Sequence, residues 1–340
     1  MTHDTQDKEA WLAATVEQPI DPGEEIVDPH HHLWDFPTGT YLVHQLHADT
    51  GAGHHVTQTV FVECAAGYRT SGPEHLRPVG ETEFVREQAE ISATADGATI
   101  SAIVSFADLT LGAAVEEVLA AHDEAGAGLF RGIRHASAWD ASDQIRESHT
   151  KPPPQLLADR DFRAGFATLG RMGFSFDAWM FHPQVAELVE LAHAVPDTPV
   201  VLDHLGGPLG IGPYTDRRDE VRAVVRPALE ALARHPQVSV KVGGIGMSIY
   251  GAGFKRLAQA PSSEHVAATW SDDIRHCIET FGPDRAMFES NFPVDRQGCS
   301  YTVLFNAFQR ICDQAGYTAA ERADLFAGTA RRFYRLERPA

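Results

Sequence analysis

The chain has 340 residues, of which 43% are hydrophobic and 22% charged, and its formal net charge is −19 at pH 7. This length suits one large α/β domain. The negative charge argues against nucleic acids and anionic membranes as partners, because like charges repel. The sequence holds no run of about 18 apolar residues that would cross a membrane. Its acidic start lacks the basic-then-apolar order of a secretory signal, so we expect a cytoplasmic protein.

Eight short apolar runs predict β-strands. In chain order they are Glu24–His30, Thr57–Cys64, Ala98–Asp108, Gly128–His135, Phe174–Phe181, Thr198–His204, Val238–Gly244 and Arg285–Ser290. Most of these runs are apolar on both faces. That is typical of parallel strands that pack inward at a barrel centre and are covered by helices outside.

Amphipathic patterns between the strands predict helices, because their apolar residues recur three and four positions apart. The helices are expected at Glu81–Ala95, Ala113–Ala125, His182–Val195, Asp219–His235 and Ser262–Phe281, and a last one begins at Thr318. Thr318 and Glu321 have the spacing of a capping box.

This alternation predicts an α/β fold, a single-domain (β/α)₈ TIM barrel over residues 24–336. Residues 1–23 would form an N-terminal extension and residues 337–340 a tail. An open doubly wound sheet is the alternative, but no GxGxxG follows the first strand. Long connections at 31–56, 136–160 and 243–262 would lie on the C-terminal face, where barrel enzymes bind substrates.

The first strand ends in the sequence VDPHHHLWD. Because side chains alternate along a strand, His30 and His32 should both point into the barrel mouth, with Asp28 one step deeper and His31 toward the helices. Two imidazoles at one strand end can bind a divalent metal, or hold a water and a substrate oxygen.

A series of motifs resembles the amidohydrolase-2 branch of the amidohydrolase superfamily, in its lactonase-like group, which includes L-fuconolactonase and 2-pyrone-4,6-dicarboxylate lactonase. In order they are VDPHHHLWD, VFVEC, FRGIRH, FHPQ, VLDHLGGP, VKVGG, MFESNFPVD and GTARRFYRL, which run from Ile26 to Leu336. The resemblance implies a barrel with one mononuclear or metal-free site at the strand ends.

By this resemblance His204, which closes the sixth strand, joins His30 and His32 in catalysis, and the three would be the ligands of any bound metal. His182 is either a further ligand or substrate-binding residue, or a helix cap. Relatives carry an aspartate where this sequence has Asn291. An amide neither accepts a proton at neutral pH nor binds metals well, so we expect either no required metal or one weakly bound divalent ion, zinc if any.

Two acids near Asn291 could act as the proton acceptor instead. Glu289 faces the same way but lies deeper, and a buried ion pair with Lys241 is its alternative role. Asp295 is favoured, because we expect it on a loop at the mouth, where it can meet a water. With this arrangement we expect hydrolysis to be at least partly independent of metal.

Four residues are candidates to bind substrate: Arg134, His182, Trp34 and Lys241. The planar fork of Arg134 suits a substrate carboxylate or a developing oxyanion, whereas Lys241 could instead belong to a structural ion pair. We therefore predict a hydrolase that opens a lactone or similar cyclic ester carrying a carboxylate. A metal-dependent decarboxylase and a non-catalytic ligand-binding barrel are the alternatives. The expected partner is an anionic small molecule, and a homodimer is compatible with the fold.

Overall fold

Eight parallel strands form one sheet in the computed structural model, which describes residues 3–338. They are β1 (Glu25–His31), β4 (His55–Val62), β5 (Thr99–Ser105), β6 (Phe130–Ile133), β7 (Ser175–Ala178), β8 (Val200–Leu202), β9 (Val238–Val242) and β10 (Ala286–Phe288). Each strand pairs with the next in this order. All eight predicted strands are present, and the fold is the predicted (β/α)₈ barrel.

The barrel closes between its first and last strands through backbone hydrogen bonds just beyond the end of β10. The amide of Asn291 donates to the carbonyl of His30 at 2.9 Å, and the amide of His32 donates to the carbonyl of Phe292 at 2.8 Å. An isolated parallel bridge joins His31 to Phe292. Several predicted site residues therefore also form the seam of the barrel.

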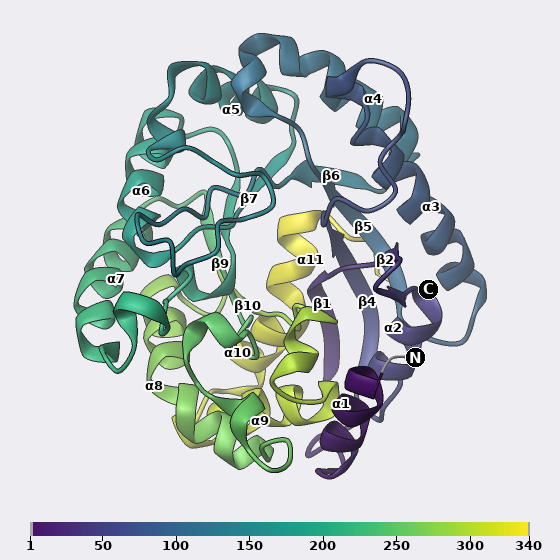
Figure 1. Cartoon of the computed structure of the whole chain (residues 1–340), viewed down its shortest axis with the longest axis vertical. Helices are drawn as coiled ribbons and strands as arrows, with labels where there is room; N and C mark the ends of the chain where they lie inside the picture. Colours follow the sequence, from purple (N-terminus) through teal and green to yellow (C-terminus); the bar gives the residue numbers. More distant parts are fainter. Residues whose placement is uncertain (1–2, 339–340) are drawn as a thin grey trace.

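Helices surround the strands on the outside (Figure 1). They are α3 (Val79–Thr94), α4 (Val115–Gly126), α5 (Arg160–Arg171), α6 (Val185–Ala194), α7 (Arg218–Leu232), α8 (Ser263–Phe281) and α9 (Tyr301–Ala315). The sequence pattern predicted five of these seven and missed α5 and α9, and it placed the start of α6 three residues early. Helix α9 is buried over most of its length, so its sequence lacks the polar face that an amphipathic pattern requires.

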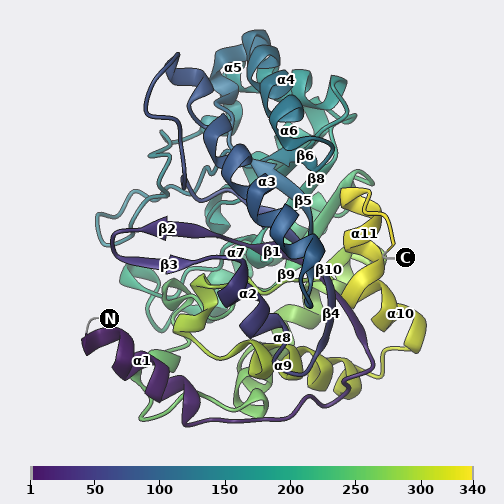
Figure 2. The same cartoon turned by 90° about the vertical axis from the view of Figure 1, so that its right-hand side faces the viewer.

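The C-terminal helices α10 (Ala319–Ala323) and α11 (Thr329–Tyr334) cover the barrel at the end opposite the β2–β3 hairpin described below (Figure 2). Tyr334 packs with the inward-facing apolar side chains of the strands, among them Val60, Val104 and Met287. The predicted capping box is present, because Thr318 Oγ1 accepts from the amide of Glu321 while Glu321 Oε2 accepts from the amide of Thr318.

The long connection predicted after β1 contains short elements that the sequence pattern did not predict. It contains the antiparallel hairpin of β2 (Trp34–Phe36) and β3 (Gly39–Tyr41), followed by α2 (Val43–Thr50). These elements are too short for a periodic pattern to emerge. The hairpin follows β1 and projects away from the barrel (Figure 2).

The N-terminal segment lies outside the sheet and packs on the barrel. Helix α1 (His3–Ala13) is followed by an extended stretch whose amides at Ile20 and Asp21 donate to the side chains of Asn306 and Gln309 on α9. The predicted boundary at residue 24 stays a prediction, as does the tail at 337–340. Residues 1, 2, 339 and 340 lie outside the described residues. No helix within residues 3–338 is long and apolar enough to cross a membrane.

We predict that Asn306→Ala lowers the free energy of unfolding by about 1–3 kcal/mol, because it leaves buried polar groups without partners. Asn306 is 1% exposed and bonds Glu17, Gln18 and Ile20 of the N-terminal segment. Urea unfolding measures the loss. The matched control is Gln314→Ala, an exposed position on the same helix. Equal stability of the two variants would contradict the anchoring role of Asn306.

Candidate active site

Three histidine rings meet at the C-terminal end of the barrel. The ring centroids of His30 and His32 are 5.0 Å apart, and those of His30 and His204 are 4.5 Å apart. The structure thus brings together the three histidines that the sequence singled out, and it turns His31 outward against Phe61. Their chemical roles stay predictions.

Asp28 does not lie beneath His30 as expected. Its carboxylate accepts hydrogen bonds from the amides of His30 and Ser290 and from the hydroxyl of Tyr301 on α9. The pairing of β1 with β4 shifts register between Asp28 and His31, where Pro29 cannot donate to the ladder. The strict alternation that the prediction assumed is therefore broken at this point.

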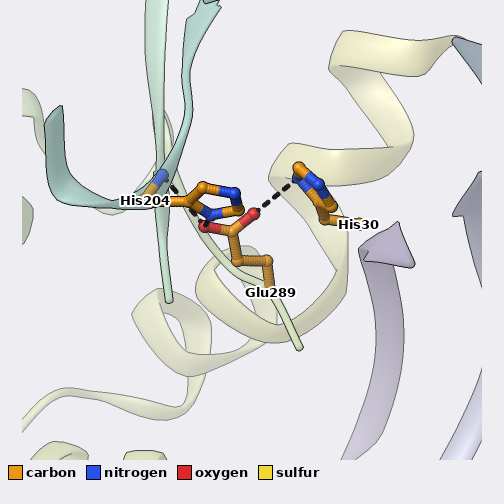
Figure 3. Close-up of side chains that lie close together, drawn as sticks. All are labelled: His30, His204 and Glu289. Carbon is orange, nitrogen blue, oxygen red and sulfur yellow. Dashed lines mark hydrogen bonds and ion pairs between the residues drawn. The ribbon is translucent and has the colours of Figure 1, made fainter. Parts of the chain in front are cut away.

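Glu289 reaches two of the histidines (Figure 3). Its Oε1 lies 2.7 Å from Nδ1 of His204, and its Oε2 lies 2.9 Å from Nδ1 of His30. The backbone amide of His204 also donates to Oε1, at 3.1 Å. Depth along the strand was expected to limit the reach of Glu289, and the structure shows that it does not. Burial raises the pKa of Glu289 and lowers that of His204 to about 3.

Two glycines after β9 make room for this contact. A Cβ at Gly243 would lie 2.4 Å from Cγ of Glu289, and one at Gly244 would lie 2.6 Å from the ring of His204. Gly244 also has φ +67°, which side chains rarely tolerate. The VKVGG motif therefore serves the close packing of Glu289 and His204.

Lys241 is fully buried beneath this cluster. Its Nζ lies 2.6 Å from Oδ2 of Asp177, 3.1 Å from Oδ1 of Asp203 and 3.1 Å from Nδ1 of His30. Burial alone would lower the pKa of Lys241, but the two aspartates outweigh it and raise that pKa. The ammonium is thus held by protein carboxylates, which supports the structural alternative over direct binding of substrate.

The guanidinium of Arg134 is already engaged by Glu63. Its Nε donates to Oε1 of Glu63 at 2.8 Å and its Nη2 to the carbonyl of Glu63 at 2.5 Å, while Nη1 lies 3.3 Å from Nε2 of His30. Burial would raise the pKa of Glu63, but Arg134 and His149 outweigh it and lower that pKa to about 2. Glu63 therefore already holds two of the three guanidinium nitrogens, and the binding of a substrate carboxylate by Arg134 stays a prediction.

Asp295 is not at the mouth, which corrects the reason for favouring it. Its side chain is fully buried and accepts hydrogen bonds from the amide of Gly246 at 2.7 Å and from Nδ2 of Asn291 at 2.8 Å. Asn291 Oδ1 in turn lies 3.2 Å from Nε2 of His32. Asn291 and Asp295 therefore form a buried chain that ends on His32.

The remaining two candidates, His182 and Trp34, have different surroundings. His182 Nδ1 accepts from the amide of Leu209 at 3.4 Å, and its ring packs against Tyr214 at 4.9 Å, so it caps a connection rather than joining the three histidines. Trp34 of the hairpin stacks on His32 at 6.4 Å between ring centroids. Of these two, only Trp34 contacts the cluster.

Three acids of the site were not predicted from the sequence: Glu63, Asp177 and Asp203. Each is fully buried at or near the end of a strand. A charged residue within or just after an apolar strand is costly unless it is paired or used, and this signal, which Arg134 and Lys241 share, would have found these acids.

A family model described as Amidohydrolase matches residues 27–336 of the chain. The chain belongs to the amidohydrolase family. Its relatives include the uncharacterized protein y4mH of Sinorhizobium fredii, which is 29% identical over 92% of this chain and 98% of its own. The L-fucono-1,5-lactonase of Burkholderia multivorans is 27% identical over 92% of this chain and 97% of its own. A zinc-bound amidohydrolase structure from Burkholderia multivorans is 25% identical, with a TM-score of 0.70, and covers 92% of this chain and 99% of that one.

We predict that Lys241→Met destabilises this amidohydrolase by about 3–5 kcal/mol, because removal of one member of a buried ion pair leaves uncompensated charge. Asp177 and Asp203 would both lose their nearest cation. Urea unfolding at neutral pH measures the effect, and the exposed Lys255→Met is the matched control. A Lys241→Met protein as stable as the control would refute this view of the buried network.

Proposed function

We propose that the protein hydrolyses lactones at the cluster of His30, His204 and Glu289. The observation that carries the proposal is the Glu289 carboxylate between two imidazoles at the C-terminal end of an amidohydrolase barrel. Full-length similarity to L-fucono-1,5-lactonase supports a cyclic ester as the substrate class. A shorter match of 24% identity over 70% of this chain, to an L-rhamnono-gamma-lactonase of Scheffersomyces stipitis, points the same way.

His204 and Glu289 together supply the proton acceptor in this proposal. A neutral His204 donates its Nδ1 proton to Glu289 Oε1, 2.7 Å away, and leaves Nε2 to take a proton from the attacking water. The carboxylate then stabilises the imidazolium. As the tetrahedral intermediate collapses, His204 returns the proton to the ring oxygen, and the product is a hydroxy acid.

Arg134 and Trp34 complete the proposed site. Nη1 of Arg134 is the one guanidinium nitrogen that Glu63 does not hold, and it can offer positive charge to a developing oxyanion. Trp34 stacks on His32 and can cover an apolar face of the substrate ring.

The same three side chains fit a divalent metal. The ligand atoms of His30, His204 and Glu289 lie within 4.8 Å of one another, and two imidazoles with a carboxylate suit zinc. Buried carboxylates also outnumber buried cations around the cluster, with Glu63, Asp177, Asp203 and Glu289 against Arg134 and Lys241. When bound, zinc would lower the pKa of a water and polarise the lactone carbonyl.

Lys241 opposes tight binding of that metal. Its Nζ is 3.1 Å from Nδ1 of His30, so a second cation at this nitrogen meets electrostatic repulsion. We infer a weakly held ion and hydrolysis that continues in part without it.

A neutral lactone is favoured over one that carries a carboxylate. The fork of Arg134, which was expected to bind that carboxylate, is occupied by Glu63. Further negative charge at this site would face four buried acids. This reasoning favours a neutral sugar lactone as the substrate.

We predict that the protein hydrolyses L-fucono-1,5-lactone or L-rhamnono-γ-lactone with a higher kcat/KM than 2-pyrone-4,6-dicarboxylate. Acid release is followed with a pH indicator, and His204→Asn controls for spontaneous opening. Turnover of the dicarboxylate alone would contradict the preference. Release of CO2 from an aromatic acid without lactone hydrolysis would favour a decarboxylase, and no turnover at all would favour a binding barrel.

We expect prolonged dialysis against a strong chelator to remove any zinc and to leave part of the lactonase rate. Elemental analysis before and after dialysis measures the metal, and the same lactone assay measures the rate. Zinc addition should then raise the rate without being required for it. One tightly held zinc per chain, with activity lost on removal and restored by zinc, would show that this inference is wrong.

A further inference from the structure

A cavity of about 260 Å³ lies between α7 and α8, outside the barrel. Buried apolar side chains form much of its wall, among them Leu205, Val225, Leu229 and Trp270. Of the described residues that line it, none belongs to the cluster of His30, His204 and Glu289. The cavity is therefore a separate space from the candidate active site.

Several arginines surround this cavity in a chain whose net charge is −19. Four arginines line it, namely Arg218, Arg222, Arg226 and Arg256, with two aspartates, Asp216 and Asp273. Asp273 lies within 3.2 Å of three of these guanidiniums, and Asp272 pairs with two of the three. Arg256 is exposed, and no side-chain partner for it is found in the described part of the chain. The lining therefore favours an anion.

Two buried nitrogen donors of the lining lack acceptors. They are Nε of Arg226 and Nε1 of Trp270, and apart from histidine nitrogens they are the only side-chain nitrogens that are buried and unpartnered in residues 3–338. The guanidinium of Arg218 also lies 4.6 Å from the centroid of the Trp270 ring. Unpaired buried donors are costly, so a ligand with acceptor oxygens would supply what the protein lacks here.

The wall of the cavity is connected to His204. Tyr250 lines the cavity, and its hydroxyl donates to the backbone carbonyl of His204 at 3.0 Å. Leu205, the next residue in the chain, lines the cavity as well. His204 and Leu205 have φ of +55° and +59°, a conformation that non-glycine residues hold only when their surroundings enforce it. A ligand against Tyr250 and Leu205 therefore acts on the backbone that carries His204.

We propose that this cavity binds a small organic anion with an apolar body, a carboxylate of one aromatic ring or a short chain, and that the ligand adjusts His204 through Tyr250. A cavity of about 150 Å³ admits benzene, so the present one has room for a ring and its carboxylate. Arg256 binds the carboxylate together with the unpartnered donors of Arg226 and Trp270, and the apolar wall receives the ring. The effect on His204 rests on the proposed lactonase function, whereas binding does not.

Calorimetry on the full-length protein tests the site, with benzoate as the probe and benzamide as its neutral isostere. We expect saturable binding of benzoate and at least tenfold weaker binding of benzamide, as lost charge-assisted contacts imply. Arg256→Ala should weaken benzoate about tenfold, and Val225→Phe should abolish binding by filling the cavity. Arg275→Ala, an exposed arginine of α8 outside the lining, is the matched control.

If Val225→Phe fails to fold, Arg256→Ala alone tests whether benzoate binds in this cavity. Arg256 is exposed, so its substitution should leave the fold intact. Absence of saturable binding overturns the proposal. Benzoate affinity that is equal in wild type and Arg256→Ala also overturns it, because the acid then binds elsewhere.

The connection to His204 is tested with Tyr250→Phe, which removes only the hydroxyl that donates to His204. In the wild type, saturating benzoate should change kcat for the lactone at least twofold. The Tyr250→Phe variant should bind benzoate with unchanged affinity, but addition of benzoate should not change its kcat. A rise in KM alone indicates competition at the active site and overturns the proposal, as does an equal kcat change in Tyr250→Phe. Absence of any lactone turnover would instead count against the proposed function, and calorimetry would still decide the site.

Discussion

The rest of this site depends on one buried carboxylate that contacts two imidazoles. Glu289 follows β10, His30 lies one residue before the end of β1 and His204 follows β8, so one side chain connects three strand ends. Such contacts are stronger inside a protein than in water, because the surroundings screen charge poorly. The Gly243–Gly244 pair is the structural condition for this arrangement, since any larger residue would collide with Glu289 or His204.

Charge balance explains much of the surrounding sequence. Lys241 and Arg134 each compensate buried acids, and Arg134 keeps only Nη1 outside its contacts with Glu63. Charge balance also explains why residue 291 is an asparagine. Its Nδ2 lies 2.8 Å from an oxygen of Asp295, so an aspartate in its place would set two carboxylates against each other. Its φ of +55° is also one that asparagine tolerates better than most residues.

The barrel could be predicted from the sequence because strands and helices differ in period. Helix α9 could not be predicted, because it is buried on most sides. The β2–β3 hairpin could not be predicted either, because each of its strands has only three residues. The meeting of His30, His32 and His204 followed from their places at strand ends. The partners of Arg134 and Lys241 did not follow, because Glu63, Asp177 and Asp203 approach from other strands with registers that no local pattern reveals.

The burial of Asp295 could not be predicted from its distance along the chain from the end of the eighth strand. Asp295 lies four residues beyond Asn291, and this position predicted a solvent-exposed loop. Its carboxylate is instead fully buried against Gly246 and Asn291. Asp295 and Gly298 pack closely against Gly246 in the connection that follows β9. Glu289, which was expected to lie too deep, is instead the acid that reaches the imidazoles.

The most direct test of this account is the kcat/KM of Glu289→Gln for the sugar lactone that the wild type opens best. The account predicts a fall of about 10²–10⁴-fold, the usual contribution of a positioned acid–base group, with circular dichroism confirming that the fold is retained. The exposed Glu87→Gln on α3 should keep the wild-type rate. A folded Glu289→Gln protein with unchanged kcat/KM would contradict the central role of this carboxylate.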